Sequence, residues 1–373
     1  MKKVGIITMH KVVNYGSALQ AYALQRVIEK LGYDCEIIDY VYPNEYHLSQ
    51  YPKLPAWKSW VLFLIQMLYG FPQKKRIKLF ERFYKDYLKL SPVCYKSREQ
   101  LQGNPPHYDI YVTGSDQVWN PKSIVEDTSF MLSFVRNDVH KISYAASFAT
   151  DSIPDRFRGL YKAYLDMYSA ISVREKNGIE IIRNLIGKKA ELVLDPTILL
   201  EAEEYNLIVD KSVVSINEPY ILAYLLSYKF DPHPYVEHIV KYVQKKTGYK
   251  VVLLSVADTK MLFTSNAVRL QNVGPSEFVY LFKHASFVVT TSFHGTAFSV
   301  IYNKPFYTLV QPNSSDDRVT SLLKSLGLEK RLVYMETNVD NLSLEIENNL
   351  NISDRLRMAR KSSIAFLQRT LAE

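Results

Sequence analysis

The sequence predicts an α/β protein of two domains, each built on a parallel sheet that helices cover on both faces. The chain has 373 residues, which suits two domains because one domain takes roughly 100 to 200 residues. Short apolar runs alternate with segments of helical spacing, as is typical of parallel sheets. The alternation begins again after DPTILLEAEEYNLIV, so we place the boundary between residues 200 and 217. The predicted domains are residues 1–205 and 206–350, followed by a helix over residues 351–373.

The individual elements follow from periodicity. The first strand is VGIIT, and the helix after it is predicted from apolar residues at helical spacing and a terminating Gly32: Leu24, Val27, Ile28 and Leu31. Further strands in the first half are predicted at CEII, DIYVT, ISYAA, AISV and ELVL. The second half predicts strands at YILAYLL, KVVLLS, SFVVTT and FYTLV, with helices over residues 236–246, 276–285, 295–302 and 353–372.

The composition is that of a globular protein with a sizeable core, at 47% hydrophobic and 23% charged residues. Cys35 and Cys94 share no CxxC spacing, which disfavours a disulfide framework and a thiolate zinc site. MKKVGIITMH has too few apolar residues for a signal peptide, so we expect a cytoplasmic protein. The formal net charge is +8, but the basic residues are scattered and no nucleic-acid-binding motif occurs. We therefore expect no nucleic acid partner.

The longest apolar run is Trp60–Phe71, which is too short for the roughly 20 residues of a membrane-spanning helix. The basic segment KKRIK, Lys74–Lys78, follows it. One interpretation is a helix packed on the domain. The other is a helix lying at a membrane surface, with its basic side chains toward anionic headgroups. A peripheral membrane contact therefore stays open.

Polar residues follow the carboxyl ends of the predicted strands, where open α/β sheets bind ligands. In the first half they are His10, Asn14–Gly16, Asp39, Gly114–Gln117, Ser147, Arg174–Glu175 and Asp195. In the second half, His294 lies between a strand and a helix. A histidine there can give or take a proton near neutral pH, and the N–H groups of Gly295 and Thr296 could bind an anion. Equally, His294 could cap the helix or lie in the core.

The segment GPSEFVYLFKHASFVVTTSFHGTAFSVIYNKPF resembles the polysaccharide pyruvyl transferase family. Further motifs similar to that family's occur in the expected order: NYGSALQAYAL, TGSDQVWNP, YAASFA, SVRE and LDPT. The resemblance implies two Rossmann-like domains facing across a cleft, as in glycosyltransferases of the B type. It also implies transfer of the pyruvyl group of phosphoenolpyruvate onto two sugar hydroxyls as a cyclic ketal, with release of phosphate. The product would be a cell-surface polysaccharide or exopolysaccharide.

The resemblance also implies roles for residues on the donor side. His294 matches the family's acid/base histidine, and Arg174 matches the arginine of SVRE, whose guanidinium suits the donor carboxylate. Alternatively, Arg174 forms a surface ion pair with Glu175. Some members carry an arginine where this chain has Ser292, so another cation must hold the donor phosphate beside Gly295 and Thr296. The candidates are Arg318 and then Lys304, and either could be an ordinary surface charge.

On the acceptor side, Asp116 is expected to orient or deprotonate a hydroxyl, and the indole of Trp119 to stack on a sugar ring. Asp116 could instead cap a helix, and Trp119 could belong to the core. The three residues Asn14, Tyr15 and Gly16 precede the first helix and are expected to line the same cleft.

The sequence contains no dinucleotide or P-loop fingerprint and no spacing of a tight metal site. We therefore expect catalysis without metal or cofactor, with phosphoenolpyruvate as donor and a saccharide, free or lipid-linked, as acceptor. A lipid-linked acceptor would suit a position at the inner face of the membrane. Two alternatives remain: a nucleotide-sugar-dependent glycosyltransferase, which could use the same cleft, and a carbohydrate-binding protein without catalytic activity.

Overall fold

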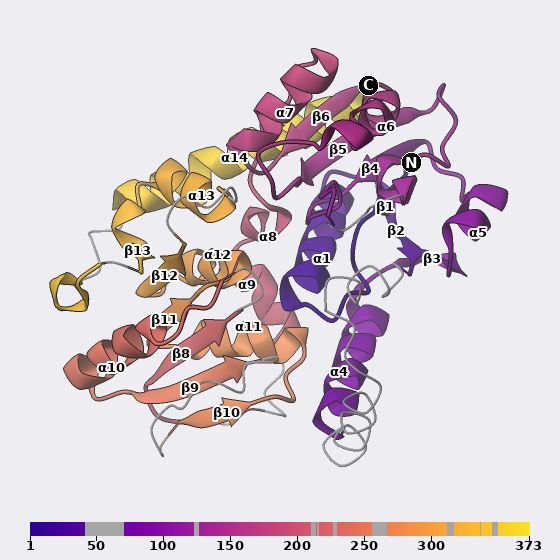
Figure 1. Ribbon diagram of the computed structural model, residues 1–373. Coiled ribbons are helices and arrows are strands. Elements are labelled where there is room, and N and C mark those ends of the chain that lie inside the picture. The colour runs from indigo at the N-terminus through magenta and orange to yellow at the C-terminus, as the bar shows by residue number, and fades with distance from the viewer. Residues whose placement is uncertain are drawn as a thin grey trace, which may run out of the picture.

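The computed structural model of the protein describes residues 1–41, 71–122, 127–209, 214, 216–226, 230–255, 267–311, 317–335, 337–344 and 350–373. Within these ranges the chain forms two sheets that lie side by side, each covered by helices (Figure 1). Every strand pairing described is parallel. The predicted fold class, two parallel-sheet α/β domains, is confirmed.

The first sheet has the strand order β3-β2-β1-β4-β5-β6-β7. Its strands are β1 (Lys3–Ile7), β2 (Asp34–Tyr40), β3 (Leu90–Tyr95), β4 (Ile110–Thr113), β5 (His140–Ala146), β6 (Ala170–Val173) and β7 (Glu191–Leu192). Its helices are α1 (Tyr15–Lys30), α4 (Phe71–Tyr87), α5 (Arg98–Gly103), α6 (Asp155–Leu165) and α7 (Lys176–Ile186). The predicted strands of this half are confirmed, although ELVL is strand only over β7, and β3 was not predicted.

The second sheet has the strand order β10-β9-β8-β11-β12-β13. Its strands are β8 (Tyr220–Leu225), β9 (Lys250–Ser255), β10 (Val268–Leu270), β11 (Phe287–Thr290), β12 (Phe306–Val310) and β13 (Leu332–Tyr334). Its helices are α10 (Tyr235–Thr247), α11 (Pro275–His284), α12 (Phe293–Ile301) and α13 (Arg318–Leu326). The predicted strands and helices are confirmed, whereas β10, β13 and α13 were not predicted.

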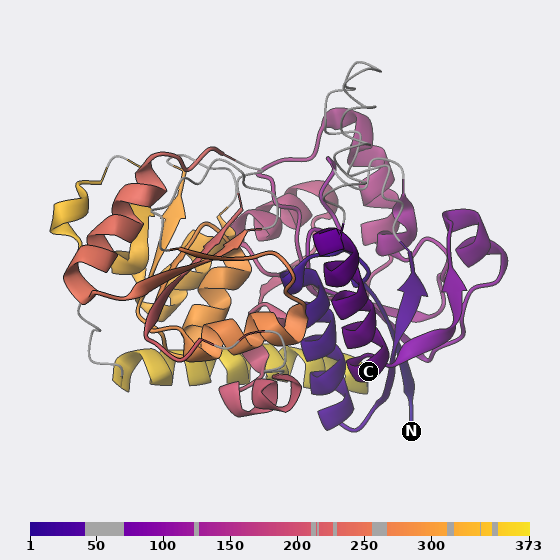
Figure 2. The same ribbon diagram turned by 90° about the horizontal axis from the view of Figure 1, so that it is seen from below.

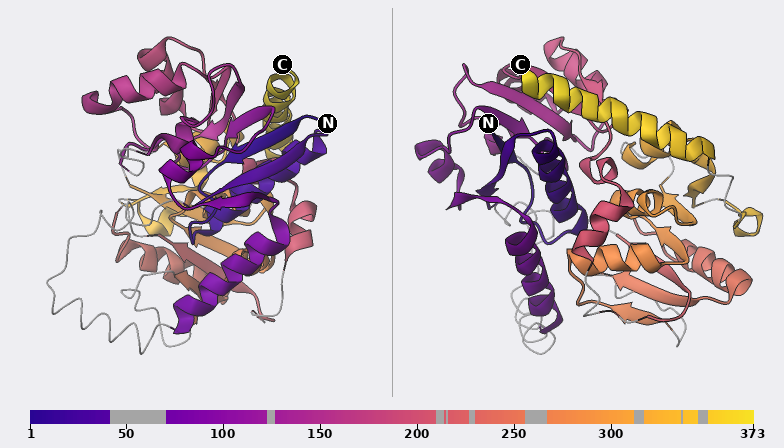
Figure 3. Two further views of the ribbon diagram at one scale, coloured as in Figure 1. Left: turned by 90° about the vertical axis from the view of Figure 1, so that its right-hand side faces the viewer. Right: turned by 180° about the vertical axis from the view of Figure 1, so that it is seen from behind.

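Short elements and one long helix connect the halves. The chain crosses from β7 to β8 through α8 (Pro196–Leu199), α9 (Ala202–Tyr205) and a 3₁₀ turn over Asn206–Ile208. Helix α14 (Leu350–Ala372) then returns from the second half to the first (Figure 3). Its Ser363 hydroxyl accepts the Leu194 N–H at 3.0 Å, and its Arg360 Nε donates to the Ile198 carbonyl at 2.6 Å. The exact domain limits stay a prediction.

The beginning of α1 packs against the second half, beside α11 (Figure 2). The Tyr15 ring stacks on Phe278 with 4.6 Å between centroids, and its hydroxyl donates to the Val273 carbonyl at 3.1 Å. Because α1 follows the carboxyl end of β1, this contact brings the ligand-binding edge of the first sheet to the second half.

Helix α4 contains the basic segment Lys74–Lys78. Lys74, Lys75 and Lys78 are exposed, but Arg76 is 7% exposed and lies 5.0 Å over the Tyr15 ring. Arg76 also donates to the Val13 carbonyl at 3.1 Å, so at this residue the helix follows the first interpretation, packing on the domain. Residues 60–70 of the predicted interfacial segment lie outside the described residues. None of the described helices has the length and apolarity of a membrane span.

Candidate active site

His294 lies at the junction of the two halves. Strand β11 leads into α12, whose N-cap Ser292 accepts the Gly295 N–H at 3.3 Å, and His294 follows in the first turn. The imidazole packs directly on Gly16 of α1, where an added Cβ would lie only 1.9 Å from His294 Nδ1. Only glycine leaves room for the ring at this position, so the helix beginning of the first half confines the histidine of the second.

Arg174 follows β6, and its side chain is completely buried. Its Nη1 donates to Asp195 Oδ2 at 2.7 Å, and its Nη2 donates to Asp116 Oδ1 at 3.3 Å. His294 Nε2 lies 3.9 Å from the same Asp195 Oδ2. The structure thus brings together the arginine of the first half and the histidine of the second, as predicted, through a carboxylate between them.

Asp195 is the member of this cluster to which sequence reasoning gave no role. Its Oδ1 accepts the N–H and the hydroxyl of Thr197 at 3.0 and 2.7 Å, which caps α8. Its Oδ2 accepts the Ser115 hydroxyl at 2.9 Å in addition to Arg174. The available signal was its place after the run ELVL, at the carboxyl end of a predicted strand.

A second guanidinium reaches the cluster from α13. Arg174 and Arg318 lie over the Phe293 ring, with 5.0 and 5.9 Å from each guanidinium carbon to the ring centroid. Arg318 is 4% exposed, so it is no ordinary surface charge. Lys304 precedes β12 and therefore lies at the opposite edge of the sheet, which makes its candidacy for the donor phosphate wrong.

Burial and charge set the protonation of the cluster. Burial alone would raise the pKa of Asp116 and Asp195, but Arg174 and His294 outweigh it and hold both below the usual range. Burial also raises the pKa of Glu175, whose Oε1 accepts the Phe148 N–H at 2.7 Å. Burial lowers the pKa of His294 more than Asp195 raises it, so the resting imidazole is neutral near pH 7.

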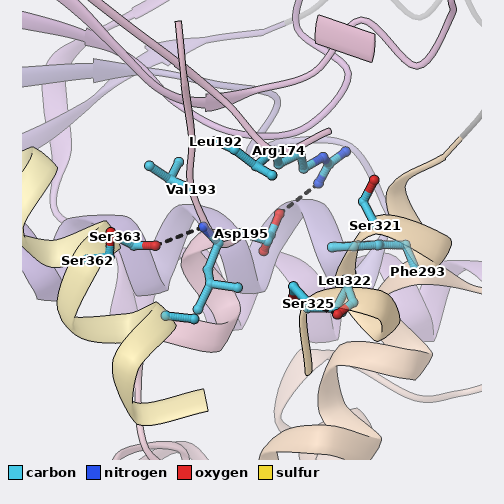
Figure 4. A pocket seen from close by; sticks show the side chains of 12 residues that line it. Arg174, Leu192, Val193, Asp195, Phe293, Ser321, Leu322, Ser325, Ser362 and Ser363 are labelled. Carbon is cyan, nitrogen blue, oxygen red and sulfur yellow. Dashed lines mark hydrogen bonds and ion pairs between the residues drawn. The ribbon is translucent and has the colours of Figure 1, made fainter. Parts of the chain in front are cut away.

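A cavity of about 210 Å³ adjoins Arg174 and Asp195. Figure 4 shows Arg174 above Asp195, with their ion pair drawn, and Phe293 to the right of them. Apolar side chains line part of the rest. Four hydroxyls line the remainder, from Ser321 and Ser325 of α13 and from Ser362 and Ser363 of α14. An engineered cavity of about 150 Å³ binds benzene, so this volume suits a small molecule.

Comparison with known proteins identifies the family. A family model described as polysaccharide pyruvyl transferase matches residues 14–311. The chain belongs to this family. A search of curated protein sequences finds no match.

The similar solved structures are GT-B-fold proteins. One is UDP-GlcNAc 2-epimerase from Neisseria meningitidis bound to UDP-GlcNAc, with 10% identity, TM-score 0.55 and 100% of each chain covered. Another is the 2-epimerase from Methanocaldococcus jannaschii, with 12% identity, TM-score 0.56, and 97% of this chain and 99% of that chain covered. At such identity the likeness shows the fold alone, and it confirms the expected GT-B-like arrangement.

Several predicted site residues of this pyruvyl transferase family member serve the structure instead. Trp119 is fully buried, its Nε1 donates to the Phe130 carbonyl at 3.2 Å, and Phe148 and Tyr168 pack on it. The prediction that a sugar stacks on this indole is therefore wrong. Tyr15 is 1% exposed and packs on Phe278 of the second half, so its predicted place in the cleft lining is also wrong.

The predicted anion site at the start of α12 is already satisfied. The Gly295 N–H donates to the Ser292 hydroxyl, and the Thr296 N–H donates to the Ser292 carbonyl at 3.0 Å. These two N–H groups are therefore not available to a phosphate, which corrects the prediction for Gly295 and Thr296. Ser292 itself is 3% exposed and acts as the helix cap.

Asp116 completes the cluster from the first half, and Asn14 caps the helix beside it. The Asn14 Oδ1 accepts the N–H groups of Gly16 and Ser17 at 2.9 and 3.3 Å and so caps α1. Asp116 has φ of 78° and accepts a hydrogen bond from the Ser17 hydroxyl. Its carboxylate remains 12% exposed, so it is the acidic group of the cluster most accessible to a ligand. The described residues contain no group of three or more His, Cys, Asp and Glu that could hold a metal ion.

Proposed function

We propose that this protein transfers the pyruvyl group of phosphoenolpyruvate onto two hydroxyls of a saccharide as a cyclic ketal. The observation that carries the proposal is the meeting of Arg174 and His294, from different halves, at one oxygen of Asp195. Membership of the polysaccharide pyruvyl transferase family supports it. Phosphoenolpyruvate is the donor substrate in this proposal, and no further cofactor is required.

The reaction needs a proton donor for C3 of the donor and the bonding of two hydroxyl oxygens, one after the other, to C2. His294, in its protonated form, gives a proton to the methylene carbon C3 of the donor while a sugar hydroxyl oxygen bonds to C2. The second hydroxyl then bonds to C2 as the C2–O bond to phosphate breaks. One hydroxyl proton leaves with the phosphate. The other goes to the imidazole, which returns to its protonated form. General acid catalysis of this kind typically contributes about 10²- to 10⁴-fold.

The donor's negative charges require cations. Arg318 and Arg174 lie around Phe293, and the Arg174 Nε has no hydrogen-bond partner among the described residues. We assign the donor phosphate to Arg318 and the donor carboxylate to Arg174. Asp116 orients the acceptor hydroxyl rather than removing its proton, because its lowered pKa makes it a weak base.

Donor binding itself charges the histidine. In the free protein His294 is neutral near pH 7, since burial disfavours the imidazolium. A dianionic donor placed beside the ring supplies the opposite charge and favours protonation. The protonated form of His294 is thus produced only when the donor is bound.

The acceptor belongs to the assembly of a cell-surface polysaccharide or exopolysaccharide, on the cytoplasmic side. A lipid-linked acceptor would bring the protein to the membrane, where Lys74, Lys75 and Lys78 are the exposed cations of α4. Flotation with anionic liposomes tests this part. Equal flotation after replacing these three lysines by glutamate would contradict a role for this surface.

The test of the reaction is ³¹P NMR of the purified protein with phosphoenolpyruvate and a panel of p-nitrophenyl hexosides. We expect inorganic phosphate and a ketal product, and neither from His294→Gln. Release of a nucleoside diphosphate from UDP-sugars, with phosphoenolpyruvate untouched, would identify a glycosyltransferase instead. Hexoside binding without consumption of either donor would identify a carbohydrate-binding protein.

A further inference from the structure

We propose that Asp195 is a positioning residue that orients the His294 imidazole and stabilises its protonated form during catalysis. This inference rests on the proposed function, in which His294 is the proton donor. Asp195 is assigned no such role by the comparisons, and its side chain is completely buried. Figure 4 shows its carboxylate facing Arg174 at the edge of the cavity.

The position of Asp195 is fixed from several directions. Thr197 donates two hydrogen bonds to Oδ1, and Ser115 and Arg174 donate to Oδ2. The neighbouring backbone is held as well, because the Leu194 N–H donates to Ser363 of α14. A carboxylate restrained in this way presents Oδ2 to His294 Nε2 at 3.9 Å without losing energy to reorganisation.

The two ring nitrogens of His294 face different surroundings. Nδ1 lies against Gly16 of α1, where an added Cβ would be 1.9 Å away. Nε2 points toward Asp195 Oδ2 and has no hydrogen-bond partner among the described residues. We expect the neutral ring to carry its hydrogen on Nε2, toward the carboxylate, so that Asp195 favours this tautomer.

Four charged side chains, from different elements of the two halves, surround His294. Arg174 after β6 and Arg318 of α13 disfavour the imidazolium, whereas Asp195 and Asp116 favour it. Of the two carboxylates, Asp195 has the larger effect. Without Asp195, burial and two guanidinium groups would act against only Asp116, so the pKa of His294 would fall further and a bound donor would charge the ring less readily.

The first test is the pH profile of phosphate release from phosphoenolpyruvate by Asp195→Asn. Because the acid must be protonated, activity falls as pH rises through the pKa of His294. We expect the alkaline limb of the variant to move down by about one pH unit or more, so that lowering the pH restores part of the rate. The matched control is Asp86→Asn, the same substitution at an exposed carboxylate of α4 outside the cluster; its limb should stay in place. A uniform loss in Asp195→Asn at all pH values would overturn the proposal.

The second test needs no donor. In the full-length protein with ¹⁵N-labelled histidine, the ring signals that disappear in His294→Gln identify His294. We expect the neutral ring to carry its hydrogen on Nε2, and a ring protonated on Nδ1 would overturn the proposal. Titration of the same signals in Asp195→Asn, where it folds, should give a lower pKa. If the tautomer is as expected but phosphoenolpyruvate is never consumed, the proposed function fails while the role of Asp195 in holding this ring stands.

Discussion

Replacing Gly16 by alanine tests how tightly the two halves confine His294. The added Cβ would lie 1.9 Å from Nδ1 and 2.3 Å from Cε1 of the imidazole. Non-bonded carbon and nitrogen atoms approach to about 3.5 Å, so the ring must move by roughly 1.5 Å. On its other side the ring faces Asp195 at 3.9 Å, so it cannot move that far without breaking the cluster.

The expected effect is large on activity and small on the helix. A misplacement of about 1 Å at a reacting group can cost roughly 10²-fold, so kcat should fall by at least about 100-fold. Alanine favours a helix over glycine by about 1 kcal/mol, so α1 itself should form normally. The loss should therefore appear in kcat rather than in helix content.

The assay is phosphate release from phosphoenolpyruvate with the hexoside panel, alongside thermal unfolding. Gly159→Ala is the matched control, because Gly159 lies within α6 and an added Cβ meets nothing within 4 Å. This control should keep wild-type kcat and be as stable or slightly more stable. Wild-type kcat in a folded Gly16→Ala protein would refute the close packing of α1 on His294.

Four further outcomes follow from the site and its surroundings. Arg318→Met should raise the KM for phosphoenolpyruvate by about 10- to 100-fold through loss of charge-assisted hydrogen bonds, and an unchanged KM would remove Arg318 from the donor site. Trp119→Phe should lower the free energy of unfolding by about 1–2 kcal/mol, since the indole loses its bond to Phe130, while the KM for the hexoside stays unchanged; a raised KM would restore the stacking role. Ser292→Ala should cost about 1 kcal/mol in urea unfolding as a lost helix cap, and no cost would contradict the cap. Because burial lowers the pKa of His294 in the folded protein, stability is lost as pH falls below its unfolded value of about 6.5; His294→Gln should lose less stability than wild type between about pH 7 and 5, and an equal loss would contradict the burial of an uncharged ring.

The fold was predictable wherever strands lie inside a sheet. The central strands β1, β4 and β11 are buried almost throughout, so they read as short apolar runs. Strand β3 escaped prediction because it is an edge strand with Pro92 in it and three consecutive exposed residues. The edge strands β10 and β13 escaped because each has only 3 residues, which is too short to show a periodic signal.

The site was predictable as far as strand ends define it. Arg174, Asp116 and His294 follow the carboxyl ends of their strands, and the structure brings them together. What periodicity does not contain is the direction of a side chain after the strand ends. Trp119 turns into the core and Tyr15 turns into the domain interface, although both neighbour true members of the cluster.

The partnership of Asp195 with His294 lies further beyond sequence reasoning. It depends on the packing of one half on the other, which brings residues 195 and 294 to 3.9 Å. Tyr15, Phe278 and the return of α14 set that packing. None of these contacts leaves a local periodic signal.

The most direct measurement of the central claim is a crystal structure of the protein grown with phosphoenolpyruvate at saturating concentration. Our account predicts one donor molecule in contact with both Arg174 and His294, with its phosphate toward Arg318 and its methylene carbon toward the imidazole. A donor bound away from these residues, or a site without donor density at saturation, would contradict it.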